Sequence, residues 1–145
     1  MTESTAPTDE ERTWGMYAHL SGLLAFTGIP FGGLLGPFVM YLQNKPVRPF
    51  ATEQAREALN FHITYGIVQF VALVIAICAW FGMVIGVANA PKSADVPLAN
   101  LGVAGVAFAA FFLVYLWTFV LTVVATIRAS SGQIYRYPLT IRFVR

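Results

Sequence analysis

Three long stretches of the chain carry no charged residue, and polar segments separate them. They lie between Arg12 and Lys45, between Glu57 and Lys92, and between Asp95 and Arg128. Each is longer than the roughly 20 residues that an α-helix needs to cross the hydrocarbon core of a bilayer. The pattern predicts an all-α polytopic membrane protein with three transmembrane helices, at residues 14–42, 59–87 and 101–127.

Glycine and proline interrupt the first of these segments between Gly28 and Gly33, and Pro37 follows. Proline removes a backbone donor and glycine loosens the chain, so a helix is expected to break here. We favour a single broken span. The alternative is a re-entrant hairpin of two short helices, and in either case Gly32 and Gly36 are candidate positions for close helix packing.

Residues 53–65 join a charged, helix-forming run to a long apolar one. Thr52 is the expected N-cap, and the pattern predicts an amphipathic helix that leads into the second span, with its first turns in water. The polar side chains of this stretch form a candidate interface or polar entrance: Glu53, Arg56, Glu57, Asn60 and His62.

Asn60 and His62 are expected at the boundary between water and lipid, where a polar side chain needs a partner. We expect Asn60 to bond backbone freed at Pro30 or Pro37, or to bond the C-terminal tail. The alternative is that it lines an entrance for a substrate. His62 is expected to be an interfacial packing residue, although an exposed histidine would titrate near neutral pH.

Small and hydroxylated residues recur along the second and third spans. Gly82 and Gly86 form a GxxxG pattern that permits close contact between membrane helices. Thr118, Thr122 and Thr126 follow at intervals of four residues, so they share one face. We expect each hydroxyl to bond its own helix. A polar face that lines a groove is the alternative.

The two ends of the chain differ in charge and in pattern. Residues 1–12 are acidic and polar and are expected to be a disordered tail, ahead of a single membrane domain at 13–145. Residues 133–145 are basic and alternate between apolar and polar side chains, which predicts an extended segment. That segment is expected to anchor at the headgroups or, alternatively, to dock on a partner or on the helix at 53–60.

Charge fixes the expected orientation and excludes one class of partner. Hydrophobic residues make up 57% of the chain and charged residues 11%, with a net charge of +2 and no basic patch suited to nucleic acid. Basic residues gather in the loop at 44–56 and in the C-terminal tail. By the positive-inside rule both face the cytoplasm, and the connector at 89–100 lies outside.

The sequence offers little for catalysis. It contains two histidines and one cysteine, Cys78, and no spacing that would supply three or four metal ligands. No phosphate-binding glycine loop or nucleophile motif occurs. We therefore expect no enzyme, no metal site and no cofactor.

Four motifs occur in the order typical of one bacterial family: AHLSGL at 18–23, GP at 36–37, EALNF at 57–61 and YRYPLTIR at 135–142. The chain resembles a family of small bacterial membrane proteins of unknown function. That family is similar to the twenty-kilodalton subunit of the chloroplast inner-envelope protein import (Tic) translocon. The last motif contributes further candidate residues: Tyr135, Arg136, Tyr137, Pro138 and Arg142.

The resemblance implies a structural or interaction subunit of a membrane complex, associated with protein translocation. The expected partners are the lipid bilayer and either further copies of the chain or other membrane proteins. A small oligomeric channel or transporter is the alternative, with its polar path formed by the broken first segment, Asn60 and the threonine face.

Overall fold

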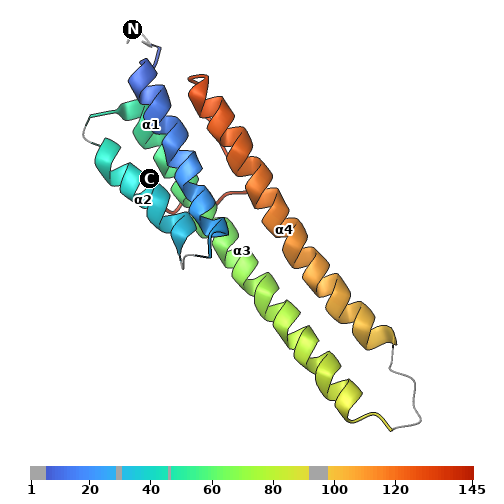
Figure 1. Ribbon diagram of the computed structural model, residues 1–145. Helices are drawn as coiled ribbons and strands as arrows, with labels where there is room; N and C mark the ends of the chain where they lie inside the picture. Colours follow the sequence, from blue (N-terminus) through green and yellow to red (C-terminus); the bar gives the residue numbers. More distant parts are fainter. Residues whose placement is uncertain (1–5, 29–30, 46, 92–97) are drawn as a thin grey trace. The chain divides into compact units, whose positions relative to one another are not determined.

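The computed structural model describes residues 6–28, 31–45, 47–91 and 98–145, and within these ranges it contains helices and no strand (Figure 1). The elements are α1 (Asp9–Leu20), the 3-10 helix η1 (Ser21–Phe26), α2 (Gly32–Asn44), α3 (Pro49–Ala88) and α4 (Leu98–Ser130). The all-α prediction is confirmed. The chain divides into two compact units: unit 1 is Met1–Gly66 with Thr118–Arg145, and unit 2 is Ile67–Trp117.

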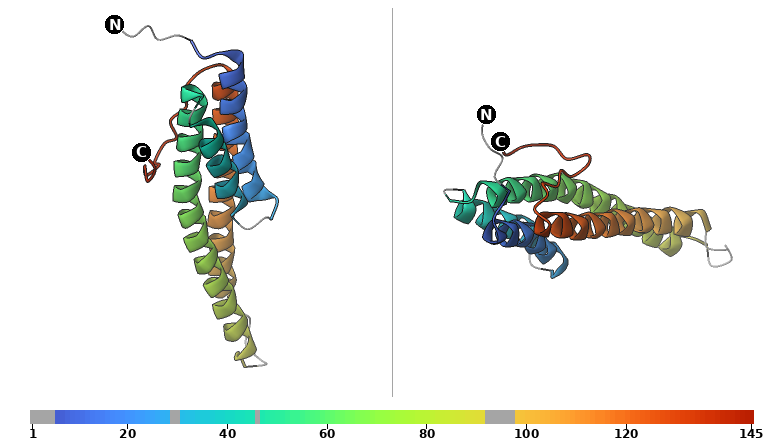
Figure 2. Two further views of the ribbon diagram at one scale, coloured as in Figure 1. Left: turned by 90° about the vertical axis from the view of Figure 1, so that its left-hand side faces the viewer. Right: turned by 90° about the horizontal axis from the view of Figure 1, so that it is seen from above.

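The first hydrophobic segment folds back on itself within unit 1. A Cβ atom added at Gly36 would lie 2.5 Å from the carbonyl oxygen of Ser21, and one added at Gly32 would lie 2.6 Å from that of Leu24. Gly36, further along α2, thus lies beside Ser21 at the start of η1, and Gly32 lies beside Leu24 further along η1. Helix α2 therefore runs antiparallel to η1 and α1 (Figures 1 and 2). The prediction of a single broken span is wrong, and the structure has the hairpin instead.

The reversal falls where glycine and proline predicted a break. Gly28 and Phe31 both have positive φ angles, of 78° and 59°. Such a backbone costs a bulky residue free energy, so the packed helices on either side must hold Phe31 in this conformation. Ile29 and Pro30 lie outside the described residues.

Helix α1 begins at Asp9, within the stretch expected to be a disordered tail. Thr8 caps it: the Glu11 backbone N–H donates to the Thr8 hydroxyl, and the Thr8 N–H donates to the Glu11 carboxylate, both at 3.2 Å. This reciprocal capping box stabilises the first turn. Residues 9–12, predicted to be disordered, therefore belong to α1.

Helix α3 contains the stretch at 53–65, and its environment differs from the prediction. The helix begins at Pro49, a favoured first helical residue, so Thr52 is not its N-cap and bonds the Arg48 carbonyl instead. Its first turns were expected in water and the following polar residues at the lipid boundary. Other parts of unit 1 bury these side chains instead: Gln54, Glu57, Asn60, His62 and Thr64.

Among the described residues, two helices are long and apolar enough to cross a membrane, Pro49–Ala88 and Leu101–Ser130, and their most apolar stretches of 18 residues have mean hydropathies of 2.7 and 2.3. Of the three predicted spans, two are supported by helices in the described part of the chain. Large apolar side chains are exposed along both segments of unit 2, for example Phe70, Phe81 and Leu113. Such a surface suits lipid better than water.

The two predicted glycine pairs have different surroundings. Gly32 and Gly36 lie against η1, as described above. Gly82 has no described atom within 4 Å of the place a Cβ would occupy, so it makes no close helix contact within the described chain. Gly86, its partner in the GxxxG pattern, is half-buried.

Candidate functional site

The C-terminal tail docks on α3 through the side chain of Asn60. The Asn60 amide nitrogen donates to the Val144 carbonyl at 2.9 Å, and the Val144 N–H donates to the Asn60 amide oxygen at 2.8 Å. One turn further along α3, the Thr64 hydroxyl accepts from the Ile141 N–H at 3.1 Å. The predicted bond between Asn60 and the tail is confirmed. Of the two expectations for the tail, the structure has the docked arm.

Tyr137 brings the tail into the core of unit 1. Its ring stacks on Phe61, with centroids 3.8 Å apart and planes 11° from parallel, and both side chains are buried. Its hydroxyl lies 2.9 Å from Nδ1 of His19. The tail thus joins α1 to α3 through one aromatic side chain.

His19 is the centre of a buried hydrogen-bonded chain. Its Nε2 lies 2.7 Å from the Gln54 side-chain oxygen, and the Gln54 amide donates to the Gln133 carbonyl at 2.8 Å. Because the Gln54 oxygen can only accept, Nε2 carries the proton and Nδ1 accepts from Tyr137. Burial lowers the pKa of His19 to about 4 and raises the pKa of Tyr137 well above its ordinary value, so both side chains are neutral.

A pH titration should reveal this buried neutral histidine. Between pH 6.5 and pH 4 the unfolded chain protonates His19 while the folded chain does not, so acidification favours unfolding. We expect His19 to contribute about 2 kcal/mol to the fall in the free energy of unfolding from pH 8 to pH 5. Thermal unfolding of the purified protein across this range measures it. His62 is a second buried histidine and contributes a loss of its own over the same pH range. His19→Gln should therefore remove only the His19 part of the loss, and a loss as steep as that of the wild type would exclude His19 as a cause.

Tyr137→Phe should isolate the hydroxyl bond. The variant keeps the ring on Phe61 but leaves Nδ1 of His19 without a donor, which should lower the free energy of unfolding by about 1–2 kcal/mol. The half-buried Tyr135 makes a ring contact with Tyr137, and Tyr135→Phe is the matched control. Equal unfolding temperatures for the two variants would show that the bond contributes nothing.

His62 lies in a notch lined by glycines of the hairpin. A Cβ atom at Gly22 would overlap its imidazole ring, and one at Gly33 would lie 3.2 Å from its Nδ1. The ring is buried, and its Nε2 has no hydrogen-bond partner among the described residues. The hairpin thus covers the His62 ring, and the prediction that His62 lies at the depth of the lipid boundary stays a prediction.

Residues that the sequence singled out in two separate stretches line one pocket. It encloses about 270 Å³ between α3 and the tail and is lined by Glu53, Arg56, Glu57, Asn60, Arg136, Arg142, Val144 and Arg145. We call it the arginine pocket. Val144 and Arg145 were not singled out from the sequence, whereas His62, Tyr135, Tyr137 and Pro138 do not line it.

Two ion pairs organise the arginine pocket. Glu53 pairs with Arg56 one turn along α3. Nε of Arg142 donates to Oε1 of Glu57 at 3.2 Å, and the Glu57 side chain is 3% exposed while that of Arg142 is 50% exposed. The second carboxyl oxygen of Glu57 is buried with no partner among the described residues. A buried carboxylate of this kind holds its arginine firmly, because losing the partner would leave its charge uncompensated.

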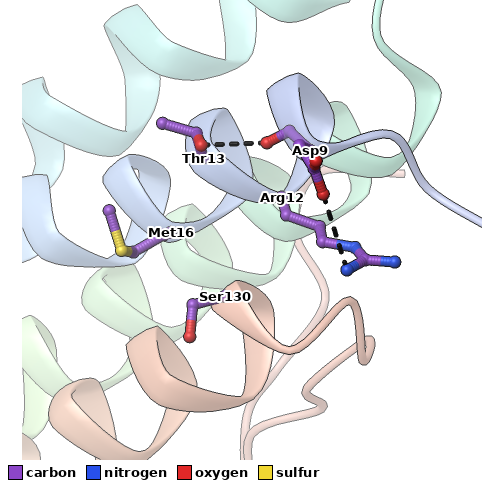
Figure 3. A pocket seen from close by; sticks show the side chains of 5 residues that line it. All are labelled: Asp9, Arg12, Thr13, Met16 and Ser130. Atoms are coloured by element: carbon purple, nitrogen blue, oxygen red, sulfur yellow. Dashed lines mark hydrogen bonds and ion pairs between the residues drawn. The ribbon is translucent and has the colours of Figure 1, made fainter.

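A second pocket, of about 180 Å³, lies between α1 and the end of α4 (Figure 3). Asp9, Arg12, Thr13, Met16 and Ser130 line it. The Arg12 guanidinium lies 3.7 Å from the Asp9 carboxylate, and the Thr13 hydroxyl donates to the Asp9 carbonyl at 2.9 Å. Its two charges neutralise each other, so the lining offers no net charge to a ligand.

The described residues form no recognisable metal site. Within the ranges that the structure describes, no three side chains of histidine, cysteine, aspartate or glutamate come together to hold a metal ion. The expectation that the chain is not an enzyme stays a prediction.

Residues 10–144 match the model of the MamF/MmsF family, described as the magnetosome magnetite crystal formation protein family. The chain belongs to this family. The match runs from α1 to the tail, so the MamF/MmsF assignment covers the hairpin, both long apolar helices and the arginine pocket. No curated protein and no solved structure matches the chain.

Membership of the MamF/MmsF family supports the predicted bacterial membrane protein family. No match supports the predicted similarity to the chloroplast import subunit, or a role in protein transport. Location in a bacterial membrane follows from the family. The orientation in that membrane stays a prediction.

Proposed function

We propose that the chain is a membrane-embedded structural or interaction subunit that takes part in magnetite crystal formation at a bacterial magnetosome membrane. The family match over residues 10–144 is the observation that carries this proposal. The two long helices with exposed apolar side chains support the membrane part of it. Its partners, whether further copies or other membrane proteins, stay predictions.

The proposed arrangement places unit 1 at the cytoplasmic surface of the membrane. Only α3 and α4 cross, the α1–α2 hairpin enters and leaves on one side, and the connector after α3 lies on the other. Arg48, Arg56, Arg128, Arg136 and Arg142 all belong to unit 1, which supports a cytoplasmic position by the positive-inside rule.

No observation favours the two other functions considered from the sequence. The Thr122 and Thr126 hydroxyls donate to carbonyls of their own helix four residues earlier, as expected from the sequence. These two hydroxyls therefore give no support to a polar path for solutes. Protein translocation rests on the resemblance to the chloroplast subunit alone. Purified protein that produced solute flux in liposomes would revive the channel.

Complementation tests the proposal. In a magnetite-forming bacterium from which the MamF/MmsF genes have been deleted, expression of this chain should restore crystal size, measured by electron microscopy of isolated magnetosomes. A Gly22→Ala variant, which is expected to disrupt the hairpin, is the negative control. Wild-type protein that is present in the magnetosome membrane and leaves the crystals unchanged would contradict the proposal.

A further inference from the structure

We propose that the arginine pocket binds the phosphate of an anionic phospholipid headgroup. The pocket presents four guanidinium groups from two segments far apart in the sequence: Arg56 on α3, and Arg136, Arg142 and Arg145 on the tail. Guanidinium groups bind phosphate through paired N–H donors, which adds directional hydrogen bonds to charge attraction. Nothing in the proposed role in crystal formation requires such a site.

The charges that line the pocket do not cancel. Its two carboxylates each have an arginine partner, in the pairs Glu53–Arg56 and Glu57–Arg142. Arg136 and Arg145 are exposed and make no hydrogen bond or ion pair with the described residues. The lining side chains therefore carry an excess of two positive charges, which favours an anionic over a zwitterionic ligand.

Buried Glu57 orients Arg142 for a ligand. Because Glu57 accepts from Nε of Arg142, the two terminal amino groups of that guanidinium remain available. The Arg142 side chain is half-exposed, so a ligand can reach them. Nearby, the Asn60 bonds to Val144 hold the end of the tail against α3. The site is thus built from docked backbone and a fixed ion pair.

The surroundings favour a lipid over a free anion. Exposed apolar side chains of the tail flank Arg142 in the sequence, namely Leu139, Ile141 and Phe143. If a lipid binds with its phosphate in the pocket, its acyl chains can pack against these apolar side chains. Basic pockets at the depth of the headgroups suit anionic lipids.

Lipid binding to the purified full chain in detergent tests the proposal, with native mass spectrometry as the readout. Phosphatidylglycerol should bind more tightly than phosphatidylcholine with the same acyl chains. Arg136→Gln and Arg145→Gln should each weaken phosphatidylglycerol binding about fivefold. Arg128→Gln is the matched control, because Arg128 bonds Gln133 outside the pocket and its loss removes the same charge.

Three results would overturn the proposal. Equal binding of the two lipids would exclude an anionic headgroup. Equal effects of Arg136→Gln, Arg145→Gln and Arg128→Gln would show that only the overall charge matters. Tighter binding of inorganic phosphate than of phosphatidylglycerol would assign the pocket to a free anion. Unchanged unfolding temperatures should accompany the pocket variants, since neither Arg136 nor Arg145 has a partner to lose in the described chain.

Discussion

Replacing Gly22 with alanine should destabilise unit 1 by about 3 kcal/mol. The added methyl group would overlap the His62 imidazole, and the ring has no free space because it is buried against Gly22 and Gly33. Either the ring leaves its notch or the hairpin moves away from α3, and overpacking of a buried site typically costs 1–3 kcal/mol. Thermal unfolding in detergent measures the loss.

Two further variants make this prediction specific. Gly66→Ala is the matched control, because no described atom lies within 4 Å of its added methyl group and alanine favours the helix. The double variant Gly22→Ala/His62→Ala should lose less free energy of unfolding than the two single variants lose together, because it removes the overlap. Additive losses would mean that Gly22 does not contact His62.

Asn60→Ala should release the C-terminal tail and cost about 2–4 kcal/mol. The substitution removes two hydrogen bonds to Val144 and leaves the Val144 N–H and carbonyl without their protein partners. Loss of the tail would also expose Tyr137 and Phe61, which are now buried against each other. The expected result is a lower unfolding temperature together with a mobile tail.

Trypsin cleavage after Arg136 and Arg142 reports directly on the tail. We expect it to be slow in the wild-type protein and fast in Asn60→Ala. Asn89→Ala is the control, because the Asn89 side chain is exposed and bonds only its own helix, at Ile85. If both variants were cleaved at the wild-type rate, the Asn60 bonds would not be what holds the tail.

Much of the helical framework could be read from the absence of charge. The run from Leu59 to Val87 predicted the end of α3 to within one residue, and the run from Leu101 to Ile127 predicted α4 to within three at each end. Long uncharged runs leave few alternatives to a membrane helix. The first run was different, because glycine and proline at its centre permit either a kink or a reversal.

The choice of a hairpin depends on contacts that no local pattern contains. Ser21 must meet Gly36, and His62 must fit between Gly22 and Gly33. Those glycines could be identified as places for close packing, but not with their partners. Sequence reasoning likewise treated His62 as interfacial, because its cover comes from a segment 29 to 40 residues earlier in the chain.

Only part of the candidate site could be predicted from the sequence. Asn60 was expected to bond either the tail or freed backbone, and the first of these is found. The meeting of Glu57 with Arg142, 85 residues later, requires the whole unit to assemble. The network of His19, Gln54 and Tyr137 was missed, because His19 was considered only as a metal ligand. A lone histidine in an apolar segment needs hydrogen-bond partners once it is buried, and this requirement could have pointed to the network.

Labelling of single cysteines in intact cells of a bacterium that forms no magnetosomes tests whether the α1–α2 hairpin crosses the membrane. In a Cys78→Ala background, cysteines replace Ala6, Ser131 and Asn89 one at a time, and a membrane-impermeant maleimide is added before or after lysis. We expect Ala6→Cys and Ser131→Cys to react only after lysis and Asn89→Cys to react in intact cells. Reaction of Ala6→Cys in intact cells, with Ser131→Cys still protected, would place the two ends of unit 1 on opposite sides and contradict the account.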